Sequence, residues 1–132
     1  MREILFKAKR IDNGDWVEGN YITDEQDKEK AYIGYIFGIE DFDIVEVNPE
    51  TLCQYTELKD KNGNRIWEND IVRIENSMDE GIGNVEFYGG MWYVDGEPNN
   101  NLYDILEYDD GEVEVIGNIF DNPELLGKDG TE

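Results

Sequence analysis

The chain has 132 residues, of which 33 are Asp or Glu and 11 are Lys or Arg, so that its formal net charge is −22. A chain of this length is expected to form one domain, or two small subdomains that share a core. Hydrophobic residues make up 39% and aromatic residues 12% of the sequence, which favours a folded acidic protein over a disordered one.

The residue types that are missing exclude several classes of function. Histidine is absent and Cys53 is the one cysteine, so Ser-His-Asp and Cys-His catalytic sets, imidazole metal sites and Cys-based zinc clusters are excluded. We expect no cofactor, no intramolecular disulfide, and no catalytic, cofactor-binding or metal-binding residue. No stretch approaches the roughly 20 apolar residues of a membrane span, and the N-terminus lacks the pattern of a signal peptide. The sequence therefore predicts a soluble cytoplasmic protein with no membrane partner.

Charge is distributed unevenly along the chain. Residues 1–11 carry a net charge of +3, whereas residues 67–132 hold 18 acidic residues against Arg73 and Lys128. Because proteins bind nucleic acid by neutralising phosphates with Lys and Arg, this acidic half predicts no nucleic-acid partner. The acidic half fits either a protein partner with a basic surface or an exterior that only keeps the protein in solution. Because the N-terminal strand is basic, contact between copies of the chain in a homo-oligomer is a further alternative.

Short apolar segments separated by turn signals predict a chain of β-hairpins. The dipeptides that predict tight turns are Asn13-Gly14, Asn62-Gly63, Gly89-Gly90, Asp95-Gly96 and Asp110-Gly111. Segments rich in β-branched and aromatic residues predict strands within residues 4–9, 16–22, 31–37, 44–47, 51–55, 65–75, 83–88, 91–94 and 112–120. One short helix is predicted over residues 101–107, where Leu102, Ile105 and Leu106 follow a helical spacing and Asn101 can cap the N-terminus.

These elements predict a mainly β fold of short antiparallel strands and hairpins, with at most one short helix. We expect a single domain over residues 1–126, with an N-terminal β subdomain over about residues 1–55. A C-terminal β subdomain over about residues 64–126 is expected to form an SH3-like small barrel or a bent sheet. The tail 127–132 has nothing to bury and is expected to fray.

Motifs spread along the chain form one recognisable pattern. They are Met1-Arg2-Glu3-Ile4 with Phe6 and Ala8, Asp15-Trp16-Val17, the run from Gln54 to Gly63, its continuation from Ile66 to Val72, and the segment from Val115 to Leu126. On these residues the sequence resembles the phage YopX protein family over nearly its whole length. The resemblance implies a β-rich fold with no established biochemical activity, in a family typical of phages and prophages of Gram-positive bacteria.

The sequence departs from this family at two positions, because the family often carries glycine where this chain has Glu57 and Asn69. Asn69 can adopt the left-handed backbone that glycine favours, so we expect the turn there to be retained. The segment from Asp60 to Asn64 is expected to be a hairpin tip, and Gly117-Asn118 a bulge or corner. We interpret the family motifs as specifying the fold, with a shared binding site as the alternative.

Three groups of neighbouring carboxylates are candidate sites for chemistry, since Ca²⁺, Mg²⁺ and glycosidase transition states all favour carboxylate oxygens. The groups are Asp109-Asp110, Glu112 with Glu114, and Glu40 with Asp41 and Asp43. With 33 acids in 132 residues such neighbours arise by chance, and no segment matches an EF-hand loop. Gly81-Ile82-Gly83 lacks the third glycine of a dinucleotide fingerprint.

Cys53 and the three tryptophans are interpreted as packed residues rather than as site residues. Cys53 lies between Leu52 and Gln54 with no neighbouring cation that would activate a thiolate. Tryptophans in predicted strands more often lie in the hydrophobic core than form a surface on which bases stack. A stacking surface for single-stranded nucleic acid also needs an electropositive groove, for which this chain has too few cations. The residues concerned are Trp16, Trp67 and Trp92.

The sequence thus predicts a non-enzymatic phage or prophage accessory protein of the host bacterial cytoplasm, which acts by protein–protein binding through an acidic surface. One alternative is a DNA mimic, in which clustered carboxylates imitate phosphates and occupy the basic cleft of a nucleic-acid-binding protein. The other alternative is an enzyme that uses carboxylates and a divalent cation.

Overall fold

The computed structural model describes residues 4–37, 39, 41–75, 80–94, 101–107 and 111–127. The chain divides into unit 1, Met1–Tyr55, and unit 2, Thr56–Glu132, and each is described here by itself. The predicted turns at Asp95-Gly96 and Asp110, the acids Glu40 and Asp109, and the tail from Lys128 lie outside the described residues.

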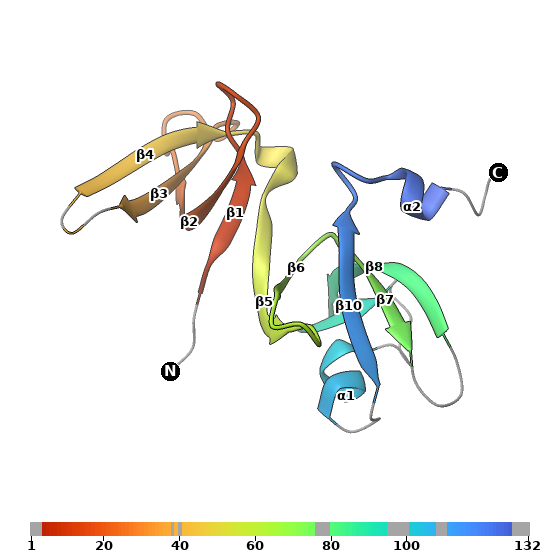
Figure 1. The fold of residues 1–132 in the computed structure, drawn as a ribbon. Helices are drawn as coiled ribbons and strands as arrows, with labels where there is room; N and C mark the ends of the chain where they lie inside the picture. The colour runs from red at the N-terminus through yellow and green to blue at the C-terminus, as the bar shows by residue number, and fades with distance from the viewer. Residues whose placement is uncertain are drawn as a thin grey trace. The chain divides into compact units, whose positions relative to one another are not determined.

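Unit 1 is built from neighbouring antiparallel strands, drawn in red to yellow in Figure 1. The strands are β1 (Phe6–Lys9), β2 (Trp16–Thr23), β3 (Ala31–Phe37), β4 (Asp41–Val47) and β5 (Cys53–Lys59), with the 3-10 helix η1 (Pro49–Thr51) before β5. They lie in the order β4-β3-β2-β1-β5, and β5 continues into unit 2, where β6 (Arg65–Trp67) is its neighbour. The strand positions follow the predicted segments with two differences: β4 begins three residues earlier than residue 44, and β5 extends to Lys59 rather than ending at residue 55.

The core of unit 1 follows from the alternation of side chains along these strands. Ala8, Ala31, Ile33 and Val47 are fully buried, and the registers place Ala31 opposite Val47 and Ala8 opposite Val17. Four partly buried side chains pack against this cluster, namely Phe6, Val17, Val45 and Leu52.

Unit 2 contains a four-stranded antiparallel sheet in the order β10-β7-β8-β9. Its strands are β7 (Asp70–Glu75), β8 (Glu80–Tyr88), β9 (Met91–Val94) and β10 (Glu112–Asn118). The predicted segment 65–75 is divided into β6 and β7 because Asn69 has φ +72° and the Trp67 N–H donates to the Asp70 Oδ2 at 2.8 Å. These two features reverse the chain direction at Glu68-Asn69.

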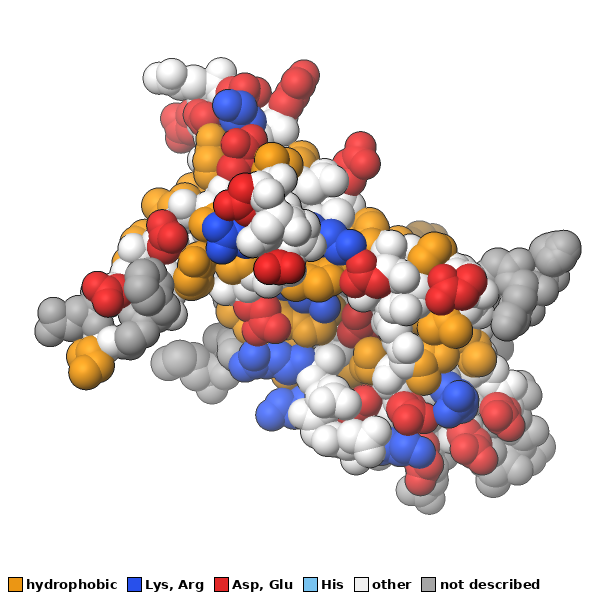
Figure 2. Space-filling view, turned by 45° about the horizontal axis from the view of Figure 1, so that its top comes forward, with side chains coloured by type: hydrophobic (Ala, Val, Ile, Leu, Met, Phe, Trp, Pro, Cys, Tyr) orange, Lys and Arg blue, Asp and Glu red, His pale blue; other side chains and the backbone are white. Residues whose placement is uncertain are grey.

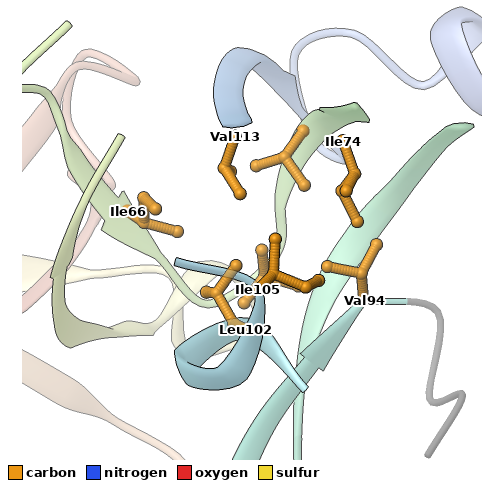
Figure 3. Packing of buried hydrophobic residues seen from close by; sticks show 8 residues of the cluster. Ile66, Ile74, Val94, Leu102, Ile105 and Val113 are labelled. Atoms are coloured by element: carbon orange, nitrogen blue, oxygen red, sulfur yellow. The ribbon is translucent and has the colours of Figure 1, made fainter. Parts of the chain in front are cut away.

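The core of unit 2 forms between this sheet and helix α1 (Leu102–Glu107), which confirms the predicted helix. Asn101 caps it, since the Asp104 N–H donates to the Asn101 Oδ1 at 3.1 Å. Figure 3 shows Leu102 and Ile105 directed from the helix into the cluster of apolar side chains. The buried members of that cluster are Ile66, Val72, Ile74, Val85, Val94, Leu102, Ile105 and Val113.

The fold class is confirmed as mainly β with antiparallel strands, while one expected detail is not confirmed and the number of helices differs from the expectation. The described strands of unit 2 form an open sheet, so the SH3-like barrel is not confirmed. A second short helix, α2 (Glu124–Gly127), follows Pro123, whose fixed φ favours the start of a helix. The Leu125 N–H donates to the Asn122 C=O at 3.0 Å, which starts this turn.

Candidate functional site

The longest family motif is held together by the buried carboxylate of Asp60. Its Oδ1 accepts from the N–H groups of Asn62 and Asn64, both at 2.9 Å, and its Oδ2 accepts from the Val115 N–H at 3.0 Å. Burial alone would raise the pKa of Asp60, but these backbone donors and the Asn64 side chain outweigh it and hold the pKa below its ordinary value. Asp60 thus fastens the hairpin tip to β10 as a structural anion.

The residues around Asp60 in the same motif also make structural contacts. The Thr56 hydroxyl donates to the Ile66 C=O at 2.7 Å and accepts from the Leu58 N–H at 3.1 Å. Glu57 lies between Thr56 and Leu58, and its φ of +72° is the left-handed conformation that glycine favours. The family that the sequence resembles often has glycine at this position. Asn69 has the same φ, as expected from the family pattern.

The C-terminal motif forms a compact corner after β10. Gly117 lies at a register shift between β10 and β7, and a Cβ there would lie 2.6 Å from the Asn122 Oδ1. That oxygen accepts from the Asn118 N–H at 3.1 Å, while the Asn118 Oδ1 accepts from the N–H groups of Phe120 and Asp121. The most specific family residues are therefore explained by the turns that they close.

A separate feature is a row of three glutamates across the sheet of unit 2. Glu112 of β10 is directly opposite Glu75 of β7, and Glu75 is directly opposite Glu80 of β8. Directly opposite residues of antiparallel strands point to the same face, so the three side chains leave the sheet from neighbouring positions of one face. We call Glu112, Glu75 and Glu80 the glutamate row.

Two cations border the glutamate row on one side. The Lys61 Nζ lies 3.4 Å from the Glu112 Oε1, and the Arg73 Nη1 lies 2.8 Å from the Glu114 Oε1. With Glu75 these side chains line a small recess in the face of the sheet. Figure 2 shows that acidic side chains also recur over much of one face of the molecule, interspersed with Lys and Arg.

The hairpin formed by β8 and β9 exposes aromatic rings. Its turn, Gly89-Gly90, has φ values of +59° and +88°, and Tyr88 and Phe87 are 70% and 54% exposed. The Phe87 and Trp92 rings are 4.7 Å apart, and the Tyr88 and Tyr93 rings 6.2 Å apart, between centroids. We call this the aromatic hairpin.

The cysteine, the tryptophans and the glycine pair of the sequence lie at separate places in the structure. Cys53 is buried in β5, and its thiol donates to the Thr51 C=O at 3.2 Å. Trp67 is buried and Trp92 packs against the core of unit 2, whereas Trp16 is partly exposed with the Lys7 Nζ 4.6 Å from its ring centroid. Gly81 and Gly83 lie within strand β8 rather than in a phosphate-binding loop.

The candidate carboxylates are only partly brought together. Glu112 joins Glu75 and Glu80, neither of which was singled out from the sequence, and Asp41 and Asp43 lie on exposed β4. Finding the glutamate row requires the strand registers, which no local pattern gives. Within the described ranges, no group of three or more His, Cys, Asp or Glu side chains is arranged to hold a metal ion.

Comparisons with known proteins agree with this architecture. The family model described as YopX protein matches residues 5–127. The crystal structure of protein EF1440 from Enterococcus faecalis is similar, with a TM-score of 0.63 and 23% sequence identity over 96% of this chain and 99% of that chain. No curated protein matches the chain. None of the helices described is long and apolar enough to cross a membrane. Because the family model covers nearly the whole sequence, the chain belongs to the YopX protein family.

Proposed function

We propose that this protein is a non-enzymatic accessory protein of a phage or prophage, which works in the host bacterial cytoplasm by binding a protein partner with a basic surface. The observation that carries the proposal is the glutamate row. Like charges directly opposite each other on a sheet destabilise it, and here Glu75 has a glutamate on both sides. Lysine or arginine side chains from a partner would relieve that repulsion on binding.

The aromatic hairpin supports the same proposal from a second feature of the sheet. Exposed tyrosine, phenylalanine and methionine are enriched in protein interfaces, where they supply large contact areas. Strand β8 carries Glu80 at one end and Tyr88 at the other, so the same strand presents an acidic and an aromatic side chain for binding. A partner with basic side chains and an apolar surface fits this combination.

The test is affinity capture from a lysate of infected host bacteria with the wild-type chain and two matched variants. One variant neutralises the row (Glu75→Gln, Glu80→Gln and Glu112→Gln). The control neutralises three exposed glutamates of unit 1 (Glu25→Gln, Glu29→Gln and Glu50→Gln), so both lose the same charge. We expect the row variant to lose the captured partner and the control to retain it, with release as salt is raised.

Two results would point elsewhere. Equal loss in both variants would show that overall charge matters and that the row does not. Release of the partner by excess double-stranded DNA would favour the DNA-mimic alternative, because the partner's binding surface would then be its nucleic-acid cleft.

A further inference from the structure

Strand β4 in unit 1 has an outer edge that its own sheet uses only in part. Near its C-terminal end the Glu46 C=O accepts from the Ile11 N–H at 3.1 Å, and the Asn48 N–H donates to the Lys9 C=O at 2.8 Å. Alternate residues of a strand direct their backbone groups to opposite edges, so Phe42 and Ile44 face the same side as Glu46. In the part of the chain that is described, no strand pairs with β4 on that side between Phe42 and Val45.

The side chain of Asp43 covers part of this edge. Its Oδ1 accepts from the N–H of Ile44 at 2.9 Å, which confirms that this N–H points away from β3. Charged side chains on an edge strand are one way in which proteins protect that edge from pairing. When a strand pairs with this edge, one of its backbone carbonyls would accept a hydrogen bond from the Ile44 N–H in place of the Asp43 carboxylate.

One face of the sheet beside this edge is apolar. Ile36 of β3 is directly opposite Phe42, and the three side chains nearest the edge are strongly exposed: Ile36 at 73%, Phe42 at 54% and Ile44 at 48%. A Cβ on Gly34, opposite Ile44, would lie 3.0 Å from both the Phe42 ring and the Ile22 Cδ1. The apolar surface therefore continues inward over Gly34 to β2, which makes it a patch rather than scattered residues.

The opposite face of the same edge is acidic. Asp41 and Asp43 point there because they alternate with Phe42 and Ile44, and both are exposed. Asp43 lies next to Tyr35, whose hydroxyl donates to its Oδ2 at 3.4 Å. The edge thus offers outward-facing backbone groups at Phe42 and Ile44, apolar contacts on one face of the sheet and carboxylates on the other.

We propose that the outer edge of β4 binds an extended segment of a partner protein whose side chains alternate between apolar residues and Lys or Arg. The segment adds one strand to the sheet, places its apolar side chains beside Phe42 and Ile44, and places its cations beside Asp41 and Asp43. This surface is distinct from the glutamate row and goes beyond the proposed function.

The test titrates the full chain with a seven-residue capped peptide that alternates Lys with Val, and follows backbone amides by NMR. We expect the largest shifts at Phe42, Asp43, Ile44 and Val45. A peptide with the same residues in blocks, and one with Glu in place of Lys, should bind more weakly, by up to about fivefold for each cross-strand charge pair that is lost. In the bound peptide the Lys and Val amides face opposite edges of the added strand, so only one of the two sets pairs with β4. N-methylation of the set that pairs with β4 should abolish binding, and N-methylation of the other set should leave it unchanged.

Protein variants separate this surface from general charge attraction. Asp41→Lys should weaken the Lys peptide about fivefold and strengthen the Glu peptide, whereas Glu25→Lys, with the same charge change elsewhere in unit 1, should change neither. The row variant described above should bind the peptide like wild type. Three results would each overturn the proposal. They are amide shifts confined to Glu75, Glu80 and Glu112, binding that neither N-methylation affects, and pairing of β4 with a second copy of the chain.

Discussion

At the scale of single residues, Asp60 stabilises unit 2 through hydrogen bonds that no local sequence pattern predicts. Asp60 is 6% exposed, and its carboxylate joins the hairpin tip after β5 to Val115 of β10, 55 residues further along the chain. Hydrogen bonds to a charged acceptor contribute about 1.5–3 kcal/mol each, and buried donors left without an acceptor cost a similar amount. The residue therefore links two distant segments by charge-assisted bonds.

Replacing Asp60 by asparagine should lower the free energy of unfolding by about 2 kcal/mol, because the amide offers one acceptor oxygen in place of two charged ones. Urea denaturation of Asp60→Asn, with the exposed Asp15→Asn as the control, measures this difference. An unchanged midpoint in the variant would contradict the structural role of the carboxylate.

The same residue predicts a pH dependence. A carboxyl whose pKa is lowered in the fold contributes stability that is present above the unfolded pKa of about 4 and is lost as pH falls through the folded pKa. The stability difference between wild type and Asp60→Asn should therefore shrink as pH is lowered from 5 to 3. A difference that is constant over this range would show that protonation of Asp60 is not coupled to folding.

Glu57 gives a prediction of the opposite sign. Its left-handed backbone costs about 1–2 kcal/mol for a side chain, whereas glycine loses about 0.5–1 kcal/mol in chain entropy. Glu57→Gly should therefore stabilise unit 2 by about 0.5 kcal/mol or more, and Lys59→Gly, in the same strand without positive φ, should destabilise it. Thermal unfolding of both variants decides the sign, and a loss of stability in Glu57→Gly would show that its side-chain contacts outweigh the strain.

At the scale of elements, the glutamate row predicts a stabilising charge reversal. Glu75→Lys would face Glu112 and Glu80, which replaces two repulsive pairs with two attractive ones worth about 0.2–1 kcal/mol each. Denaturation midpoints should rise for Glu75→Lys by more than for Glu50→Lys, which makes the same charge change outside the sheet. The difference between the two should diminish in high salt.

Elements whose signals are local could be predicted from the sequence, and those that depend on register could not. The turn at Asn62-Gly63 and the helix after Asn101 are specified by residues within one turn of them. The contact between Asp60 and Val115 depends on how strands pair, and a one-residue change of register would move every side chain to the other face. The break between β6 and β7 could be predicted only in part. The sequence indicates the left-handed backbone of Asn69, but it does not indicate the hydrogen bond from the Trp67 N–H to the Asp70 carboxylate.

At the scale of the whole molecule, acids dominate both units but not equally. Residues 1–55 contain 13 acidic and 6 basic residues, and residues 56–132 contain 20 acidic and 5 basic residues. Most of these carboxylates cannot have a cation of their own within the chain. At physiological salt the repulsion between exposed charges extends about 8 Å, which is enough to couple neighbours on adjacent strands.

This imbalance predicts how stability responds to salt. Raising ionic strength from about 10 to 150 mM shortens the screening length from about 30 to 8 Å and weakens the repulsion, so the melting temperature should rise. The rise should be smaller in the row variant, which lacks three of the crowded charges. If the carboxylates were instead neutralised by Lys and Arg of a neighbouring protomer, such as Lys7 and Lys9 on β1, salt would lower the melting temperature and shift the protein towards monomers. Calorimetry combined with sedimentation at both salt concentrations distinguishes a solvated acidic surface from an electrostatic assembly.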